Sequence, residues 1–160
     1  MKKWTLALLT LCLLFIWTAA PAESDDTAPA LQSCTHGAFT FTCPAGWEPM
    51  EMGESLMAVN VDATAFLTVF SREYKEKDID LSDEAQRASV FDALMNSFGC
   101  EESEDIGSDR RARGQLDGHD SVFYLAARGN DVLVMIYSVL EGDAPSADVI
   151  MPFVETITHP

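Results

Sequence analysis

The sequence predicts an α+β domain in which an antiparallel β-sheet is covered by helices, in the order strands, helix, strands, helix. Residues 64–72 and 132–140 are apolar on both faces, which is typical of the central strands of a sheet. A helical pattern over 83–98 separates two groups of strands, and Asp-Gly and Gly-Asn pairs join strands at short turns. Runs of strands with isolated helices indicate two packed layers.

The N-terminal segment has the pattern of a secretion signal. Two lysines precede an apolar run over 4–18, and Ala20 and Ala22 are the small residues that a signal peptidase reads. The run is shorter than the roughly 20 apolar residues that a membrane-spanning helix needs. We therefore expect a signal peptide over 1–22 and a secreted protein, extracellular or periplasmic, that has no membrane contact after cleavage.

The rest of the chain has the length of one domain. Residues 23–35 are small, polar and acidic without a helix or strand period, and we expect them to form a flexible acidic leader. Residues 36–160 are expected to form a single domain. The net charge is −16, which disfavours nucleic acid and anionic membranes as partners because both bind through Lys and Arg.

Strands are expected on both sides of the helix. The first covers 38–42, where Phe39 and Phe41 share one face, and it ends at Pro44 and Gly46. The remaining strands follow apolar patterns bounded by turn residues and cover 55–61, 64–72, 121–128 and 131–141.

Two helices are expected, one in the middle of the chain and one near its end. Ser82 is a suitable N-cap for a helix over 83–98, and Gly99 is a suitable C-terminal cap. A second helical pattern covers 147–157, where Pro152 removes a backbone hydrogen bond and should delay or kink the helix.

Opposite charges follow the first helix. Residues 101–105 are mostly acidic, and Arg110, Arg111 and Arg113 come shortly after them. We expect the two groups to face each other on successive strands, where each exposed pair contributes about 0.2–1 kcal/mol.

Three cysteines follow the expected signal peptide, and a secreted protein permits disulfides between them. Cys34 and Cys43 are nearest in sequence and are the favoured pair, although the strand between them must bend back to bring them together. Cys100 is then left as a buried thiol or as a bridge to a partner. The sequence does not exclude the other pairings.

Metal and catalytic patterns are weak. Cys34 and His36 form a Cys-x-His pair without further ligands, and the Asp78-x-Asp80-x-Ser82 segment lacks the glycine and the final glutamate of a calcium loop. His119 lies in a turn. Cys100 follows a helix C-terminus and precedes acidic residues, which disfavours a thiolate. We expect no cofactor and no metal site, and we assign no catalytic residue.

The opening strand resembles a known family. Phe39-x-Phe41-x-Cys43-Pro44-x-Gly46-Trp47 resembles the opening motif of PsbP/DcrB-like domains, whose fold is shared by a nuclear Ran-binding protein. Leu116-Asp117-Gly118 is similar to their mid-chain hairpin, and 152–157 is similar to their closing helix. The resemblance implies the fold and an accessory or binding role, with no enzyme chemistry. The lipobox common in bacterial members is absent, and Cys43 replaces a residue that is usually aliphatic.

We therefore expect a secreted accessory or binding module that contacts a protein or peptide partner through an exposed sheet face or loop around Trp47 and Met50. Two alternatives remain. One is a small secreted hydrolase or thiol enzyme that uses Cys100 and His119. The other is a divalent cation binder, which the acidic charge suggests.

Overall fold

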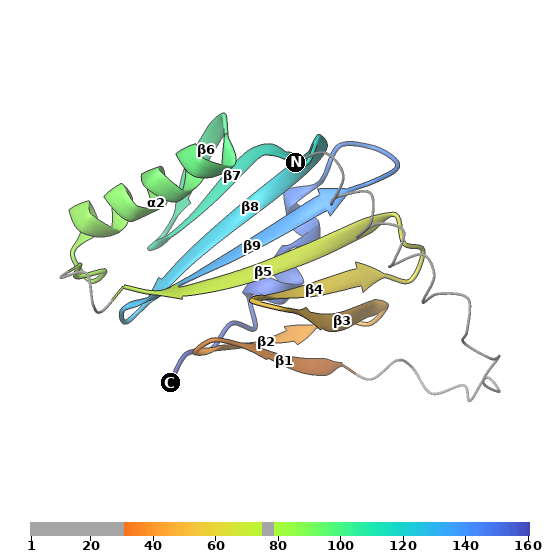
Figure 1. Ribbon diagram of the computed structural model, residues 1–160, viewed down its shortest axis with the longest axis horizontal. Coiled ribbons are helices and arrows are strands. Elements are labelled where there is room, and N and C mark those ends of the chain that lie inside the picture. The colour runs from red at the N-terminus through yellow and green to blue at the C-terminus, as the bar shows by residue number, and fades with distance from the viewer. Residues whose placement is uncertain (1–30, 75–78) are drawn as a thin grey trace.

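The computed structural model describes residues 31–74 and 79–160. Its main feature is a seven-stranded antiparallel sheet with the strand order β3-β4-β5-β9-β8-β7-β6 (Figure 1). The strands of this sheet are β3 (Trp47–Met52), β4 (Ser55–Asn60), β5 (Ala65–Glu73), β6 (Glu102–Ile106), β7 (Asp109–Leu116), β8 (His119–Arg128) and β9 (Asp131–Val139). The expected antiparallel sheet is confirmed, and β9 is its middle strand because both of its faces are apolar.

A separate hairpin precedes the sheet. It consists of β1 (Gln32–His36) and β2 (Phe39–Cys43), and it buries Phe39 and Phe41 in the core. β2 also pairs with the end of the chain through Thr40 and Thr158. The two chain ends of the described domain thus hold each other in place.

Helix α2 (Glu84–Phe98) packs on the face of the seven-stranded sheet opposite the hairpin (Figure 1). Its buried side chains are Val90, Phe91 and Met95. The cap differs from the expected one, because the Asp83 carboxylate accepts from the Gln86 N–H at 2.9 Å.

The residue expected to cap α2 has another role. The Ser82 hydroxyl donates to the carboxylate of Asp80, two residues earlier in the chain, at 2.6 Å. Gly99 ends the helix in the left-handed conformation, with φ 68°, as expected.

The closing helix expected over 147–157 is not continuous. A 3₁₀ turn, η3 (Ala147–Val149), is followed by the single-turn helix α3 (Met151–Val154). Pro152 lies in the first turn of α3, where a missing N–H costs no helical hydrogen bond. The expected order of strands and helices is therefore not matched at its last element.

The sheet separates two apolar cores, and β9 contributes to both of them. Leu133 and Met135 pack toward the hairpin and α3, whereas Val134 and Ile136 pack toward α2. Successive residues of a strand point to opposite faces, so one strand supplies both cores. The domain therefore has three layers rather than the expected two.

Two strands were not predicted. β1 begins at Gln32, inside the segment 23–35 expected to be a flexible leader; only Cys34 of this strand is buried, so its sequence has no apolar alternation. β3 contains Pro49, which an edge strand tolerates because its outer N–H groups need no partner. The expected signal peptide over 1–22 lies outside the described residues.

Candidate functional site

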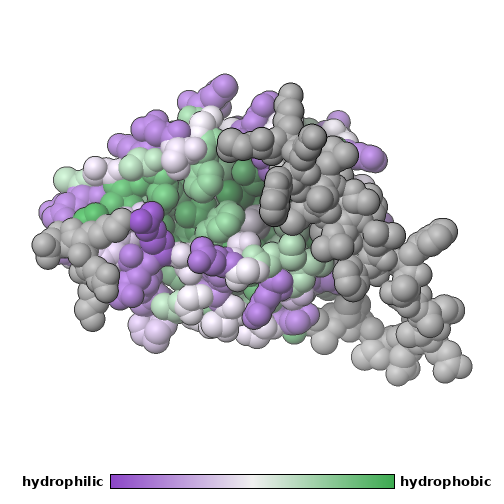
Figure 2. Space-filling view, in the orientation of Figure 1, coloured by the Kyte–Doolittle hydropathy of each residue, from purple (hydrophilic) through white to green (hydrophobic). Residues whose placement is uncertain are grey.

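The candidate site is the part of the α2-side sheet face that lies over β4 and β5. Met57 and Val59 on β4, and Phe66 and Phe70 on β5, are only half-buried. Their strand neighbours on the opposite face, such as Leu67, are fully buried. Figure 2 shows hydrophobic side chains gathered over the strands next to α2 and hydrophilic residues around them. We call Met50, Met57, Val59, Phe66 and Phe70 the apolar face.

The strand register places these side chains on one surface. Met50 pairs with Met57, and Met57 pairs with Thr68 on β5. Thr68 in turn pairs with Ile136, which packs toward α2. Because directly paired residues of antiparallel strands share a face, the row belongs to the α2 side of the sheet.

Edge strand β3 gives the apolar face an exposed border. Met50 is 39% exposed, and Met52 lies two residues further along the same side of the strand. Methionine side chains are flexible and polarisable, so they adapt to surfaces of different shape. This border of the apolar face is therefore exposed and adaptable in shape.

Helix α2 forms the opposite wall of the apolar face. Its buried side chains pack against the sheet, and the guanidinium of Arg110 on β7 binds the carboxylates of Asp92 on α2 and Asp105 on β6. The same guanidinium lies 5.7 Å from the centre of the Phe91 ring. The helix therefore covers the β7 side of the sheet and leaves the β3 side without a described covering element.

The two residues expected to form a binding surface lie on opposite faces of β3. Met50 belongs to the apolar face. Trp47 points toward the other core, where its ring lies 5.2 Å from that of Phe153 and 6.1 Å from that of Tyr137. Because the two residues are an odd number of positions apart on one strand, their side chains point to opposite faces and do not form one surface.

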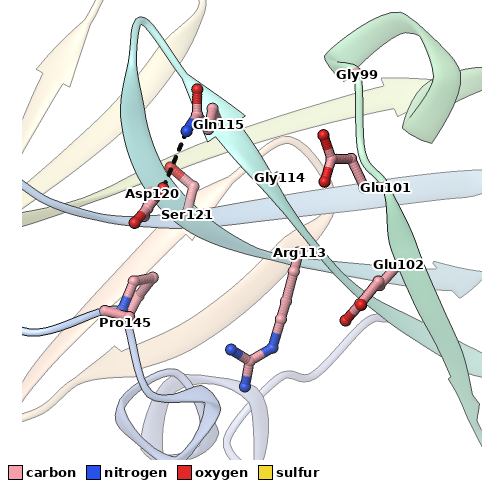
Figure 3. A pocket seen from close by; sticks show the side chains of 10 residues that line it. Gly99, Glu101, Glu102, Arg113, Gly114, Gln115, Asp120, Ser121 and Pro145 are labelled. Carbon is pink, nitrogen blue, oxygen red and sulfur yellow. Dashed lines mark hydrogen bonds between the residues drawn. The ribbon is translucent and has the colours of Figure 1, made fainter.

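A cavity lies at the edge of the sheet near β6 and β7. It has a volume of about 360 Å³, and its lining includes Glu101, Glu102, Arg113 and Asp120, together with the loop at Pro145 (Figure 3). The Asp120 carboxylate accepts from the Gln115 amide at 3.1 Å. The cavity is polar and open.

The described lining of this cavity includes neither Cys100 nor His119. Ser121 lines it, but the Ser121 hydroxyl already bonds the His119 carbonyl at 2.9 Å and the Ser138 hydroxyl at 2.7 Å. The His119 side chain is not among those lining the cavity. Burial raises the pKa of Cys100 to about 11, so its thiol is protonated at neutral pH. These positions do not support the arrangement of a thiol enzyme.

The opposite charges expected after α2 do face each other. Glu104 on β6 pairs with Arg111 on β7, and the Arg111 Nε donates to its carboxylate at 2.7 Å. Asp105 binds Arg110 at 2.6 Å. The two groups face each other as expected, but the Arg110 pair is not an exposed one, because Arg110 is buried.

The residues of the weak metal-binding patterns make ordinary structural contacts where the structure describes them. Within the described part of the chain, His, Cys, Asp and Glu side chains form no group of three that would hold a metal ion. Asp80 accepts from both the N–H and the hydroxyl of Ser82, as in a turn before a helix. Asp78, the first position of the expected calcium-like segment, lies outside the described residues.

Cys34 and Cys43, the expected disulfide pair, are both buried in the hairpin core and are free thiols. Their Sγ atoms are 3.0 Å apart. The structure therefore brings the expected partners into contact without a bond between them.

Over residues 31–74 and 79–160, no helix has the length and apolar composition that crossing a bilayer requires.

Comparison with solved structures shows that the chain has a PsbP-like fold. The solution structure of cyanobacterial PsbP from Synechocystis matches with a TM-score of 0.53 and 11% sequence identity, covering 91% of this chain and 99% of that one. A crystal structure from Bacteroides thetaiotaomicron matches with a TM-score of 0.54 and 16% identity over 84% of this chain. This chain spans about half of the Bacteroides protein, of which 49% is covered. No family model matches the sequence, and no curated protein matches it.

Proposed function

We propose that this protein is an accessory or binding module, and that its apolar face takes a protein or peptide partner. The observation that supports this role is the half-buried apolar surface over β4 and β5, bordered by exposed Met50. Contiguous apolar side chains at a surface are typical of interaction sites, because leaving them in water is unfavourable. The PsbP-like fold is compatible with such a role but does not define a partner.

Neither alternative function is favoured by a specific observation. Enzyme chemistry with Cys100 and His119 requires a reactive thiol near a base, and the Cys100 thiol has a raised pKa. Cation binding requires several oxygen ligands around one point, and the described acidic residues do not form such a group. The proposal therefore rests on the apolar face.

The place of action that we propose is outside the cytoplasm. It is supported by the charged start, the apolar run over 4–18 and the small residues that follow it. The detection of the chain beginning at Glu23 in culture medium or periplasm would support this location, and a retained N-terminus would contradict it.

The binding role is tested by photo-crosslinking from the apolar face in the cells that make the protein. A photoreactive amino acid at Met57 should give a discrete adduct. The same amino acid at Leu31, which is 70% exposed on the hairpin side of the chain, is the matched control and should not give it. The adduct should disappear when Met50→Ser is added.

Two crosslinking results would contradict the binding role. If Met57 and Leu31 give the same adducts, or if neither gives one, the apolar face is not a binding site. Circular dichroism of each variant ensures that a lost adduct does not reflect a lost fold.

A further inference from the structure

We propose that the apolar face binds a cationic amphipathic helix of a partner protein, which lies beside α2 across β3, β4 and β5. This inference rests on the proposed binding function and names the chemistry of the partner. Three properties of the described residues support it: the width of the free face, its wall and its charge.

The width of the free face suits one helix. Neighbouring strands lie about 4.8 Å apart, so three strands span roughly 10 Å between the outer two. A helix with its side chains is about 10–12 Å in diameter. The nine residues of β5 extend for about 30 Å, which is the length of roughly 20 helical residues.

The wall beside this space is apolar and already ordered. Leu94 and Phe98 of α2 are half-buried and pack against the core on this side. The Phe98 ring lies 5.5 Å from the Phe123 ring of β8, which holds it in place. A partner helix over β3, β4 and β5 would bury the apolar surface of these strands, and the wall formed by α2 would limit its position on the β7 side.

The charge around the apolar face selects a cationic partner. Glu48 lies on the same side of β3 as Met50. Asp62 is in the turn between β4 and β5, and Glu141 follows Leu140, an exposed residue after β9 whose N–H bonds the Thr64 carbonyl next to the start of β5. Arg72, at the other end of β5, is the cation placed on this side of that strand. With a chain charge of −16, Lys or Arg along the flank of a helix would be attracted and acidic flanks repelled.

The occupant is therefore expected to have an apolar stripe and basic flanks. The stripe would replace water over Phe66 and Phe70, while the basic flanks would meet Glu48 on one side and Asp62 and Glu141 at one end. Methionines 50 and 57 would adjust to the particular side chains of the stripe. This mode of recognition uses the helix as an apolar ridge placed in a groove.

The test uses synthetic peptides of about 18 residues, a length of five helical turns. One peptide has Leu on one helical face and Lys on its flanks, a second replaces each Lys with Glu, and a third has the Leu and Lys residues in scrambled order. Binding to the protein, purified from the cells that make it, is measured by fluorescence anisotropy at low and high salt.

The Leu and Lys peptide should bind, and higher salt should weaken its binding. The variant Met50→Ser with Met57→Ser should weaken it by about tenfold or more. Glu48→Gln with Asp62→Asn should weaken it by a few fold and reduce the salt dependence. Leu31→Ser, which removes an equally apolar side chain elsewhere, should leave the affinity unchanged.

Three results would overturn the inference. The first is equal binding of the acidic or the scrambled peptide. The second is peptide binding that is unaffected by the methionine variants. The third is a dimer in sedimentation that the methionine variants dissociate, because the occupant would then be a second copy of the chain. An adduct from Met57 in cells without peptide binding would leave the binding function standing and reject only this class of partner.

Discussion

The Sγ atoms of Cys34 and Cys43 lie 3.0 Å apart inside the hairpin of β1 and β2. Cys34 pairs with Phe41, so Cys43 is its diagonal neighbour two positions further along the facing strand. Both side chains point to the same buried face because they are on the same side of the ladder. Burial, together with the hydrogen bond to Cys34, raises the pKa of the Cys43 thiol.

Oxidation should join these two cysteines in preference to any pair that includes Cys100. The link would close a loop of about ten residues in the unfolded chain, which stabilises the fold by about 2–3 kcal/mol. Peptide mapping without reduction should show one linked pair, and denaturant unfolding with and without a reductant measures its effect.

The variants for this prediction are closely matched. Cys43→Ser should abolish the dependence of stability on reductant, whereas Cys100→Ser should retain it. A disulfide between Cys100 and either hairpin cysteine in the folded protein would contradict the prediction.

Cys100 should react slowly with alkylating reagents. Its pKa is raised to about 11 by burial, so the thiolate fraction at neutral pH is lower than that of an ordinary cysteine. Alkylation by iodoacetamide, followed at this residue by mass spectrometry, should accelerate with a midpoint near pH 11 in the folded protein. In denaturant the midpoint should fall to the ordinary value for cysteine, about 8.5. A midpoint near 8.5 in the folded protein would show that burial does not raise the pKa of Cys100.

The buried Asp109 carboxylate should be important for stability. It accepts from the Tyr124 hydroxyl at 2.8 Å and from Arg128 at 2.5 and 2.8 Å, and its side chain is 8% exposed. Asp109→Asn should reduce the free energy of unfolding by about 2–3 kcal/mol. This is less than for a fully buried pair, because Arg128 retains contact with water.

An exposed ion pair on the neighbouring strand provides the control. Glu104, which binds Arg111, has a side chain that is 60% exposed, so Glu104→Gln should cost less than about 1 kcal/mol. Urea unfolding monitored by tryptophan fluorescence measures both variants. Equal effects would show that burial does not distinguish the two carboxylates.

Gly37, in the turn between β1 and β2, should not tolerate alanine. Its φ is +59°, and an added Cβ would lie 2.2 Å from the Ser71 Oγ of β5. Left-handed geometry costs alanine about 1–2 kcal/mol, and the clash would add to that cost. The change should lower the free energy of unfolding and loosen the hairpin.

The backbone and contact effects of this change can be separated. Gly107 has nearly the same φ, +64°, but no atom lies within 4 Å of an added Cβ, so Gly107→Ala reports the backbone cost alone. Ser71→Gly in the Gly37→Ala background should recover the difference between the two variants. If Gly37→Ala were no worse than Gly107→Ala, the hairpin would not be held closely to β5.

Much of the fold was predictable because its signals are local. The Asp117-Gly118 turn adopts positive φ at both residues, as its sequence indicates, and Gly99 ends α2 as expected. β3 was missed because Pro49 and its acidic neighbours hide the strand pattern. The continuous helix predicted over 147–157 is wrong, although Pro152 does delay the α-helix, which covers only Met151–Val154.

The candidate site was predictable only in part. Met50 was expected to contact a partner and does lie on the apolar face, but Trp47 packs on Phe153 on the other side of the sheet. Phe66 and Phe70 were expected in a central strand. Their spacing of four positions places both side chains on one side of that strand, and this was the sequence feature that pointed to the site. Sequence alternation assigns them to one face but does not show whether that face is covered.

The sequence by itself determined the acidic charge, the strands with clear alternation, the turns and the C-terminal cap of α2, since these local elements depend on residues only a few positions apart. Tertiary structure decided which parts of the sheet are covered. Val90, Phe91 and Met95 of α2 pack in a core with side chains of β7 and β8, and Arg110 on β7 binds Asp92, 18 positions away, so α2 lies over the β7 side. The apolar face near β3 stays half-exposed for that reason, because the position of a covering helix depends on contacts between distant segments rather than on the strand pattern beneath it.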